Sequence, residues 1–159
     1  MITVRELAPS DRQWKQATLE AGWGSTVVAR LGELLDAAQL PGFVAEHDHE
    51  RVGLATVALR DDGLEVVTIQ SLLEARGIGQ ALMDRIRDHG LNVGAERIWL
   101  TTTNDNVRAF GFYQRWGMNL VQLITDGVAE SRRVKPSIPR IAKNGIPMRH
   151  ELEFELRLQ

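Results

Sequence analysis

Two glycines and an arginine lie between an apolar run and an amphipathic run of the chain. Arg76, Gly77 and Gly79 follow LEVVTIQ and open an amphipathic pattern that runs to His89. A helix that begins at Gly77 leaves its first backbone N–H groups unpaired and carries partial positive charge at that end. Because glycine has no side chain, an anion can approach these donors, and Arg76 adds a mobile cation. The segment is therefore either a phosphate or diphosphate site or a tight strand-to-helix turn that contains glycine.

Two better-known phosphate motifs do not match this turn. The dinucleotide fingerprint G-x-G-x-x-G would need glycine or alanine at position 82, where the chain has Leu82. The apolar runs before the turn also read as hairpins rather than as a βαβ unit. A P-loop needs a glycine, four residues and then Gly-Lys-Ser/Thr, and the sequence contains no such run. A nucleotide-binding protein that uses the turn in another way stays as a rival hypothesis.

The turn resembles motif A of the GNAT superfamily of acyl-CoA-dependent N-acetyltransferases, whose pattern is Gln/Arg-x-x-Gly-x-Gly/Ala. The match runs from Glu74 to Gly79, and Glu74 stands where the family carries glutamine or arginine. A second stretch, TTTNDNVRAFGFYQRWGM, resembles the later family signature Asn-x-x-Ala-x-x-Phe-Tyr-x-x-x-Gly-Phe, with Met118 in place of its last residue. The positions in register are Asn106, Ala109, Phe112, Tyr113 and Gly117.

The resemblance covers roughly residues 43–125, and the tail KPSIPRIAKNGIPMRHELEFELRL is similar to an uncharacterised bacterial subgroup of these enzymes. It implies a single GNAT domain over residues 1–159, with an α/β fold whose central mixed, twisted sheet of about seven strands has helices on both faces. It also implies transfer of an acetyl or similar acyl group from acetyl-CoA to a primary amine by direct attack. The alternative is a non-catalytic acyl-CoA-binding or sensor module on the same fold.

Acyl transfer needs a base for the amine and an acid for the departing thiolate. By resemblance, Tyr113, the only tyrosine in the chain, would protonate the coenzyme A thiolate. Its other interpretation is an aromatic core residue with a paired hydroxyl. Glu65 is the candidate base because it opens an otherwise apolar strand, although it could equally be solvated after the Asp-Gly turn. Asp105, Glu151 and a chain of water molecules are the alternatives.

The residues expected to contact coenzyme A come from both motifs. Backbone groups at the end of the apolar strand would hold the pantetheine arm, and the glycine turn would hold the diphosphate. Asn104 and Asn106 would position the amide arm or the acid, and Asn104 could equally cap a helix. The complete set is Ile69, Gln70, Ser71, Arg76, Gly77, Ile78, Gly79, Gln80, Ala81, Asn104 and Asn106.

Composition argues against several other classes of protein. The formal net charge is −2, so no broad basic surface indicates nucleic-acid binding. The absence of cysteine excludes disulfides, thiolate metal sites and cysteine nucleophiles. His47 and His49 are better explained by a polar hairpin tip than by a metal site. No apolar run approaches the ~20 residues of a membrane span and no apolar signal region opens the chain, so we expect a cytoplasmic protein without a membrane partner.

Periodicity predicts the elements of the N-terminal half. ITVRELA alternates as a strand does, and a helix that Ser10 or Asp11 could cap follows it to about Gly22. Residues 26–39 have helical spacing and predict a second helix. Three strands joined by tight turns follow, and the helix after the glycine turn is expected to stop at Gly90.

The C-terminal half predicts a strand, a helix and two further strands. RIWLTTT is β-branched, NDNVRAFGFYQRW is a helix with Asn104 or Asp105 as its cap, and GMNLVQLITD is a strand. A short helix in DGVAESRRVK and a proline-rich loop lead to HELEFELRL, whose alternation predicts one buried and one wet face. This last strand could reach a partner subunit, so a homodimer stays open, as do the acceptor amine and the acyl-chain preference.

Overall fold

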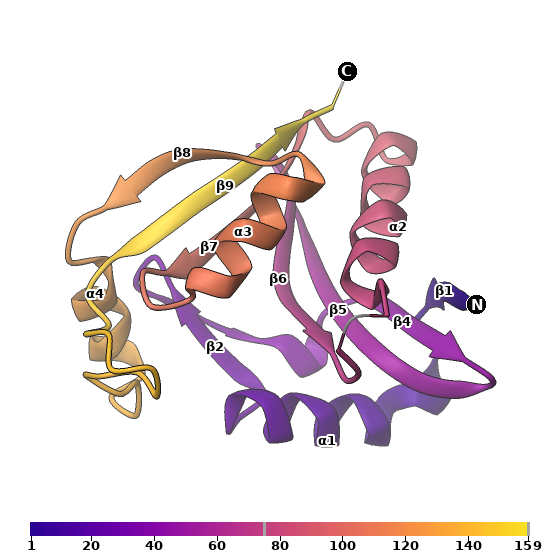
Figure 1. Ribbon diagram of the computed structural model, residues 1–159, viewed down its shortest axis with the longest axis horizontal. Coiled ribbons are helices and arrows are strands. Elements are labelled where there is room, and N and C mark those ends of the chain that lie inside the picture. The colour runs from indigo at the N-terminus through magenta and orange to yellow at the C-terminus, as the bar shows by residue number, and fades with distance from the viewer. Residues whose placement is uncertain (75, 159) are drawn as a thin grey trace. The chain divides into compact units, whose positions relative to one another are not determined.

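The computed structural model describes residues 1–74 and 76–158 (Figure 1). These residues form nine strands and four α-helices, and seven of the strands belong to one sheet. The mixed α/β class with a seven-stranded sheet is therefore confirmed. Ala75, inside the glycine motif, lies outside the described residues. None of the described helices has the length and apolar character that a membrane crossing requires.

The chain divides into two compact units. The first comprises residues 1–26, 36–98 and those from Arg157 onward, and the second comprises residues 27–35 and 99–156. Strand β7 (Arg97–Thr103) begins in the first unit and continues in the second. A single domain over residues 1–159 stays a prediction.

The first unit is built around four antiparallel strands in the order β1-β4-β5-β6. Its elements are β1 (Ile2–Glu6), the 3-10 turn η1 (Pro9–Asp11), α1 (Arg12–Trp23), η2 (Ala37–Gln39), β4 (Gly42–His47), β5 (Glu50–Arg60), β6 (Gly63–Ser71) and α2 (Ile78–Asn92). Helix α2 contacts all four strands (Figure 1). Its residues Ile78, Leu82 and Ile86, spaced by four, are fully buried, as their periodicity predicts.

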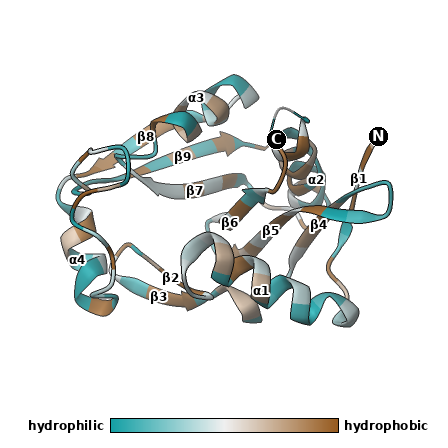
Figure 2. Cartoon of the chain, turned by 60° about the horizontal axis from the view of Figure 1, so that its bottom comes forward, coloured by the Kyte–Doolittle hydropathy of each residue, from teal (hydrophilic) through white to brown (hydrophobic). Residues whose placement is uncertain are grey.

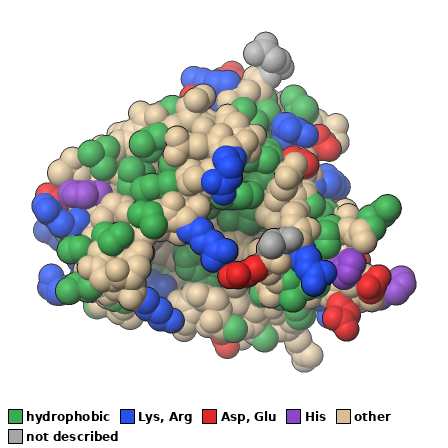
Figure 3. Space-filling model, in the orientation of Figure 1, with side chains coloured by type: hydrophobic (Ala, Val, Ile, Leu, Met, Phe, Trp, Pro, Cys, Tyr) green, Lys and Arg blue, Asp and Glu red, His purple; other side chains and the backbone are tan. Residues whose placement is uncertain are grey.

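Both hairpins of the first unit have the turns that the sequence predicts. Asp61 and Asp62 join β5 to β6, with Gly63 opposite Arg60. The β4–β5 hairpin ends in the polar residues 47–50, where Asp48 and His49 have positive φ angles of 50° and 68°. Figure 2 shows this tip as hydrophilic, and histidine and acidic side chains gather there in Figure 3. The tip is thus a solvated turn.

The second unit combines two helices with short antiparallel strand pairs. Its elements are β2 (Val27–Arg30), β3 (Glu33–Asp36), α3 (Val107–Trp116), β8 (Asn119–Ile124), α4 (Gly127–Val134) and β9 (Glu151–Arg157). Strands β2 and β3 form a two-stranded sheet, and β8 pairs with β9. The ring of Phe154 on β9 lies 5.5 Å from Tyr113 and 5.7 Å from Phe110 of α3. These aromatic contacts form the interior of the unit.

The helix predicted for residues 26–39 is wrong. The segment forms β2, β3 and η2, because Leu31 and Gly32 have φ angles of 54° and 74° and make a tight two-residue turn. Val27 and Val28 favour the strand before that turn. Leu34, which helical spacing would bury, is 49% exposed. A short apolar run fits both the period of a helix and that of a strand, and here the turn at Leu31 and Gly32 selects strands.

The prediction that Gly90 stops a helix is also wrong. Helix α2 continues to Asn92, and Gly90 is buried within it. A side chain at Gly90 would lie 2.9 Å from Leu158 Cδ1, so this glycine permits close packing. The helix ends instead before Gly94, which has φ of 74°.

Two of the residues predicted to cap helices, Asp11 and Asp105, make other side-chain hydrogen bonds instead. Asp11 precedes α1 but makes no side-chain cap, since its carboxylate accepts bonds from Arg5 and Arg51. Helix α3 begins after Asn106, so neither Asn104 nor Asp105 is its N-cap. The carboxylate of Asp105 accepts a bond from the Thr103 hydroxyl.

The C-terminal strand follows its predicted alternation only in part, since Glu153, Glu155 and Leu156 are all half-buried. Phe154 and Leu152 are buried at 0% and 8% exposure, whereas Arg157 is exposed. Glu151, expected on the wet face, is only 1% exposed. A buried carboxylate needs hydrogen-bond donors, and Glu151 has them in the second unit, as described below.

Candidate functional site

The start of helix α2 is open to a ligand. Gly77 is the N-cap residue, with φ of 72° in the left-handed region that favours glycine. A Cβ atom placed on Gly77 would meet no other atom within 4 Å. Gly77 is exposed and Ile78, directly behind it, is buried. The glycine thus serves both the backbone turn and the access to the helix start.

The unpaired donors of this helix start are fewer than the sequence suggests. The N–H of Ala81 donates to the carbonyl oxygen of Gly77 at 3.0 Å, so it is used within the helix. The N–H groups of Ile78, Gly79 and Gln80 precede that first bond and have no intrahelical partner. Three consecutive N–H groups at a positive helix end can bind a phosphate.

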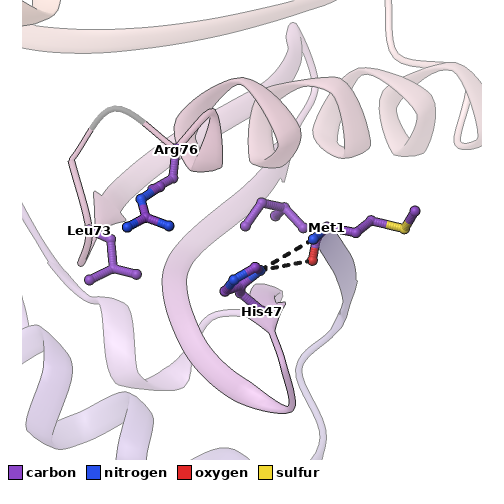
Figure 4. A pocket seen from close by; sticks show the side chains of 5 residues that line it. Met1, His47, Leu73 and Arg76 are labelled. Carbon is purple, nitrogen blue, oxygen red and sulfur yellow. Dashed lines mark hydrogen bonds between the residues drawn. The ribbon is translucent and has the colours of Figure 1, made fainter.

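Arg76 places a cation beside this helix start. Its exposed side chain lines a pocket of about 240 Å³ together with Leu73, His47, Met1 and Ile2 (Figure 4). Among the described residues no hydrogen-bond or ion-pair partner holds the Arg76 guanidinium. A guanidinium without a carboxylate partner can bind an anion.

The end of strand β6 directs part of its backbone away from β5. The N–H of Leu72 donates to the carbonyl oxygen of Val52, and bonded residues alternate with non-bonded ones along an antiparallel pair. In the register that pairs Gly53 with Ser71, Gln70 therefore bonds β5, whereas Ile69 and Ser71 point their N–H and C=O groups away from β5. Two of the three predicted pantetheine contacts have suitably directed backbone groups.

The side chain of Gln70 has a structural partner. Its amide nitrogen donates to the carbonyl oxygen of Thr18 in α1 at 3.1 Å. A Cβ at Gly22 would lie 2.0 Å from that nitrogen, so the glycine lets α1 approach β6 closely. The amide oxygen of Gln70 is buried and accepts no bond from the described residues. No pattern in the sequence indicates this helix-to-strand contact.

A β-bulge interrupts β6 upstream of the glycine turn. Thr56 of β5 lies opposite Thr68 and Val57 lies opposite Val66, so Val67 has no partner in the β5 register. The hydroxyls of Thr56 and Thr68 are 2.7 Å apart and buried. Bulges redirect backbone and side-chain groups and are frequent beside active sites. The sequence shows no signal for this one, because a bulge depends on the pairing of two strands.

Glu65 lies on the same strand and is buried. It is 1% exposed, and its Oε1 lies 3.1 Å from Nη2 of Arg60, which is on β5. The alternative interpretation, that Glu65 is a solvated residue after the turn, is therefore wrong, because its side chain is buried. The ion pair holds the carboxylate in a fixed place.

Tyr113 lies in the second unit and is 6% exposed. Burial raises the pKa of its phenol to about 12. The rings of Phe112 and Phe154 surround it, each 5.5 Å away. Its hydroxyl makes no hydrogen bond to any residue that the structure describes, so the pairing expected of an ordinary core tyrosine is missing within that part of the chain. The phenol is protonated at neutral pH and has a proton to donate.

Asn104 fastens the proline-rich loop of the second unit. Its amide oxygen accepts from the N–H groups of Arg149 and His150, both at 2.9 Å, and its amide nitrogen donates to Pro147 O at 2.9 Å. Only one amide hydrogen is left for another partner. Asn106 donates to the Thr102 hydroxyl at 3.1 Å and keeps its amide oxygen available. Of these two predicted cofactor contacts, Asn106 has the greater hydrogen-bonding capacity left.

Glu151 is the centre of a buried polar cluster in the second unit. Its Oε1 accepts from Leu31 N–H at 3.1 Å and its Oε2 accepts from Ser131 Oγ at 2.8 Å. The Ser131 oxygen also accepts from Gly32 N–H at 3.2 Å. Burial raises the pKa of the Glu151 carboxyl, and the Ser131 and Leu31 bonds and the Arg30 charge oppose this. The cluster joins the β2–β3 turn, α4 and β9.

The predicted site residues fall into two sets. The set in the first unit is Glu65, Ile69, Gln70, Ser71, Arg76, Gly77, Ile78, Gly79, Gln80 and Ala81. Tyr113, Asn104 and Asn106 belong to the second unit, as do the alternative bases Asp105 and Glu151. No group of three or more histidine, aspartate or glutamate side chains within the described residues could hold a metal ion.

Residues 8–118 match the model of the acetyltransferase (GNAT) family, over more than half of the chain. Two uncharacterized proteins of Bacillus subtilis (strain 168) are similar in sequence. YdhI is 35% identical over 133 residues, which are 83% of each chain, and YxbD is 34% identical over 144 residues, 90% of this chain and 91% of the relative.

Solved acetyltransferases have the same fold. An IAA acetyltransferase from Bacillus cereus has a TM-score of 0.71 at 17% identity, over 99% of this chain and 100% of that one. The protein yncA of Salmonella typhimurium, solved with its cofactor acetyl-CoA, has a TM-score of 0.70 at 13% identity, over 100% of this chain and 95% of that one. A Bacillus subtilis acetyltransferase in complex with CoA has a TM-score of 0.68 at 17% identity, over 99% and 98%. With its glycine turn, its family match and this fold, the chain belongs to the GNAT family of acetyltransferases.

Proposed function

We propose that this protein transfers an acetyl or similar acyl group from acyl-CoA to the primary amine of an acceptor. The observation that carries the proposal is the open start of α2, where Gly77 leaves the N–H groups of residues 78–80 accessible. Such a site suits the diphosphate of coenzyme A because it offers backbone donors and positive potential without a side chain in the way. The coenzyme bound in two of the structurally similar acetyltransferases supports the same assignment.

The residues of the first unit can hold the coenzyme by its charged and amide parts. Arg76 is exposed beside the helix start and can bind a phosphate oxygen. The backbone groups of Ile69 and Ser71 that point away from β5 can bind the amides of the pantetheine arm, as a strand binds a peptide. We assign Gln70 to the contact with α1, because its backbone and its amide nitrogen are already bonded.

The reaction needs a proton to leave the amine and a proton to reach the sulfur. The neutral amine attacks the thioester carbonyl carbon, a nitrogen–carbon bond forms and the carbon–sulfur bond breaks. We assign Glu65 to receive the amine proton and Tyr113 to donate a proton to the thiolate. The phenol of Tyr113, whose pKa burial raises to about 12, carries its proton at neutral pH and therefore has one to give to the thiolate. The β6 backbone at the Val67 bulge is our candidate for stabilising the negative charge on the carbonyl oxygen.

Thermal shift and thiol release test the proposal together. Acetyl-CoA is expected to raise the midpoint of unfolding, whereas ATP and NAD are not. Thiol release is then followed with a panel of small and peptide amines. Tyr113→Phe should lower turnover by roughly 10²-fold and leave the thermal shift by acetyl-CoA unchanged, because it removes only a proton donor.

Three results would each contradict part of this assignment. No stabilisation by any coenzyme A derivative would remove the coenzyme site at Gly77. Stabilisation by acetyl-CoA without turnover of any amine would support instead the acyl-CoA-binding or sensor module on the same fold. Full activity of Tyr113→Phe would leave the coenzyme site standing and remove Tyr113 from its role.

A further inference from the structure

Positive charge is concentrated in the stretch from Ser131 to His150. This stretch contains four arginines and two lysines and neither aspartate nor glutamate, whereas the whole chain has a formal net charge of −2. It covers the last turn of α4 and the proline-rich loop that leads to β9, and all of it belongs to the second unit. Figure 3 shows Lys and Arg side chains over this part of the molecule. The stretch therefore has a local positive potential despite the acidic balance of the chain.

Two of these six cations have no partner within the protein. Four are bonded to backbone carbonyl oxygens or to carboxylates of the second unit: Arg132, Lys135, Arg133 and Arg149. The other two, Arg140 and Lys143, are exposed, and no group of the described residues bonds to their guanidinium or ammonium groups. We call Arg140 and Lys143 the hairpin cations. Because no internal carboxylate pairs with them, they can bind an anion from outside the chain.

The hairpin cations lie on a small hairpin whose backbone is fixed by hydrogen bonds. The N–H of Ala142 donates to the carbonyl oxygen of Ile146 at 2.9 Å. The N–H of Gly145, which has φ of 86°, donates to the carbonyl oxygen of Ala142 at 2.9 Å. A turn followed by a residue in the left-handed region is typical of a three-residue hairpin loop. The hairpin therefore holds the backbone of both cations in place before a ligand arrives, which lowers the cost of binding.

The hairpin is tied to the start of helix α3. The amide nitrogen of Asn144 donates to the carbonyl oxygen of Asp105 at 2.9 Å, and its amide oxygen accepts from the N–H of Ile146 at 3.1 Å. Asp105 directly precedes Asn106, the N-cap residue of α3. The carboxylate of Asp105 accepts a bond from the Thr103 hydroxyl and forms no ion pair with the hairpin cations in the described part of the chain. The hairpin cations therefore lie beside the start of α3 without being neutralised there.

We propose that the acceptor of the acyl group carries a carboxylate or a phosphate, and that Arg140 and Lys143 bind this anion. The inference rests on the proposed acyl transfer, because Tyr113, the residue assigned to the coenzyme sulfur, lies on α3. Tyr113 follows Asn106 by seven positions on that helix. At 1.5 Å per residue this is about 10 Å along the helix axis, so we expect a distance on the order of 10 Å between the reacting amine and the bound anion. The acceptor is then an elongated molecule with an amine at one end and an anion toward the other.

Two cations suit one anionic group better than they suit a nucleic acid. A guanidinium binds a carboxylate or phosphate through two parallel hydrogen bonds, and an ammonium group adds a point charge. A nucleic acid is bound through many phosphate contacts. Outside residues 131–150 acidic residues outnumber basic ones, so the rest of the chain would repel a polyanion. The charge distribution thus favours a single carboxylate or phosphate on the acceptor.

NMR titration of the amide signals with sodium phosphate and with glutarate, at constant ionic strength, tests the anion site. Both anions should shift signals of residues 140–146, and the tighter of the two identifies the preferred group. Signals of residues 78–80 report separately on the proposed diphosphate site. Arg140→Gln combined with Lys143→Gln should weaken anion binding at the hairpin by about tenfold or more, the effect of losing a hydrogen bond to a charged group.

The matched control is Arg12→Gln combined with Arg115→Gln. It removes the same charge from two exposed arginines outside the basic stretch, so anion binding at the hairpin should be unchanged. Shifts of residues 140–146 that are absent with both anions in the wild-type protein, or equal affinities of the two double variants, would overturn the anion site. This readout does not depend on catalysis.

Turnover of matched amines tests whether the anion belongs to the acceptor. In an extended tetrapeptide amide of three alanines and a C-terminal glutamate, the glutamate lies about 10 Å from the N-terminal amine, and the glutamine peptide is its neutral match. An amino-terminated alkyl carboxylate of similar length and its amide form a second pair. With acetyl-CoA as donor, the charged member of a pair should have a kcat/KM about tenfold higher, chiefly through a lower KM. The Arg140→Gln and Lys143→Gln double variant should lose this preference, and the control should keep it.

The failure of this inference can be told apart from the failure of the proposed function. Equal kcat/KM for the charged and neutral members of both pairs would overturn the role of the hairpin in acceptor binding and leave acyl transfer standing. Binding of acetyl-CoA without turnover of any amine would overturn acyl transfer and, with it, the acceptor role of the hairpin.

Discussion

The hydroxyl of Ser131 donates a hydrogen bond of 2.8 Å to the buried carboxylate of Glu151, and the same serine oxygen accepts from Gly32 N–H. The carboxylate also accepts a hydrogen bond from the N–H of Leu31, the first residue of the β2–β3 turn. Leu31 has φ of 54°, a conformation that is costly for a residue with a side chain. These bonds therefore stabilise a turn whose own conformation is unfavourable.

Glu151→Gln should alter the pH dependence of stability. Burial raises the pKa of Glu151 in the folded state, so its contribution to stability is complete below the ordinary pKa of glutamate. That contribution is lost as the pH rises through the folded-state pKa. Glutamine has no charge to bury, so the variant should lose this part of the pH dependence and gain stability relative to wild type as the pH rises. Urea unfolding at a series of pH values measures the effect, and Glu155→Gln, on the same strand, is the control.

Titration of Tyr113 can be followed directly because the chain has one tyrosine. Tyrosinate absorbance should rise with a midpoint near pH 12 in the folded protein, since burial raises the pKa to about 12. In urea the midpoint should return to about 10, the ordinary value. The raised pKa also means that stability falls as the pH rises from about 10 through about 12. A midpoint near 10 while circular dichroism still reports a folded chain would refute the burial of the phenol.

Gly77→Ala should weaken binding of acetyl-CoA by about tenfold, equivalent to the loss of one good hydrogen bond. The added methyl group enters the open space at the start of α2, where we expect it to hinder the approach of a phosphate, and φ of 72° makes alanine cost about 1 kcal/mol of stability. Gly94→Ala is the matched control, because Gly94 has φ of 74°, lies past the other end of α2 and is equally open. It should cost the same stability and leave the dissociation constant unchanged in isothermal titration calorimetry. Equal affinities of the two variants would place the coenzyme elsewhere.

Glu65→Gln should remove the rising limb of the pH–rate profile if Glu65 receives the amine proton. The ion pair with Arg60, with 3.1 Å between nitrogen and oxygen, is lost in this variant, so unfolding must be measured in parallel. Asp105→Asn is the comparison, because Asp105 is an alternative base. A profile that changes in Asp105→Asn and not in Glu65→Gln would transfer the role to Asp105.

Asp11→Asn should destabilise the protein by about 3 kcal/mol, the cost of removing one partner from a buried ion pair. Asp11 is fully buried and accepts from Arg5 at 2.8 and 3.0 Å and from Arg51 at 2.9 Å. These bonds, with that of Arg5 first, hold the pKa of Asp11 well below its usual range. The contribution of Asp11 to stability is therefore present above the ordinary pKa of aspartate and is lost as the pH falls. The variant should not show this loss of stability in acid.

Asp62→Asn is the control for that experiment. Asp62 pairs with Arg97 at 2.9 Å, a similar distance, but its side chain is 58% exposed. An exposed pair contributes about 0–1 kcal/mol. Thermal unfolding of both variants should show a large shift for Asp11→Asn and little for Asp62→Asn, and equal shifts would contradict the importance of burial.

The sequence predicts the elements whose period and turns agree with each other. The Asp61-Asp62-Gly63 turn and the four-residue spacing of Ile78, Leu82 and Ile86 leave little choice, and these elements are confirmed. Residues 26–39 have an ambiguous period, and the turn at Leu31 and Gly32 decides for strands. Glu151 stabilises this turn by a hydrogen bond to Leu31, which lies 120 residues away in the sequence. No local sequence pattern could therefore reveal the turn.

The candidate site is predictable where a single backbone position controls it. The need for glycine at position 77 can be seen in the sequence. The N–H groups at a helix start can bind a phosphate only when no side chain blocks them. The Val67 bulge and the contact of Gln70 with α1 depend on strand register and on a helix packed beside the strand. The roles of Tyr113 and Glu65 rest on resemblance and stay predictions.

Asn104 has a consequence for how this protein can diverge. The three hydrogen bonds of the Asn104 amide lie where the proline-rich loop returns to β9. A β-bridge between Ile141 and Pro147 joins the two sides of the outer part of this loop. The tip between these residues can therefore change in length or composition while its anchorage persists. Relatives that keep an asparagine at this position can inherit the attachment and vary the rest independently.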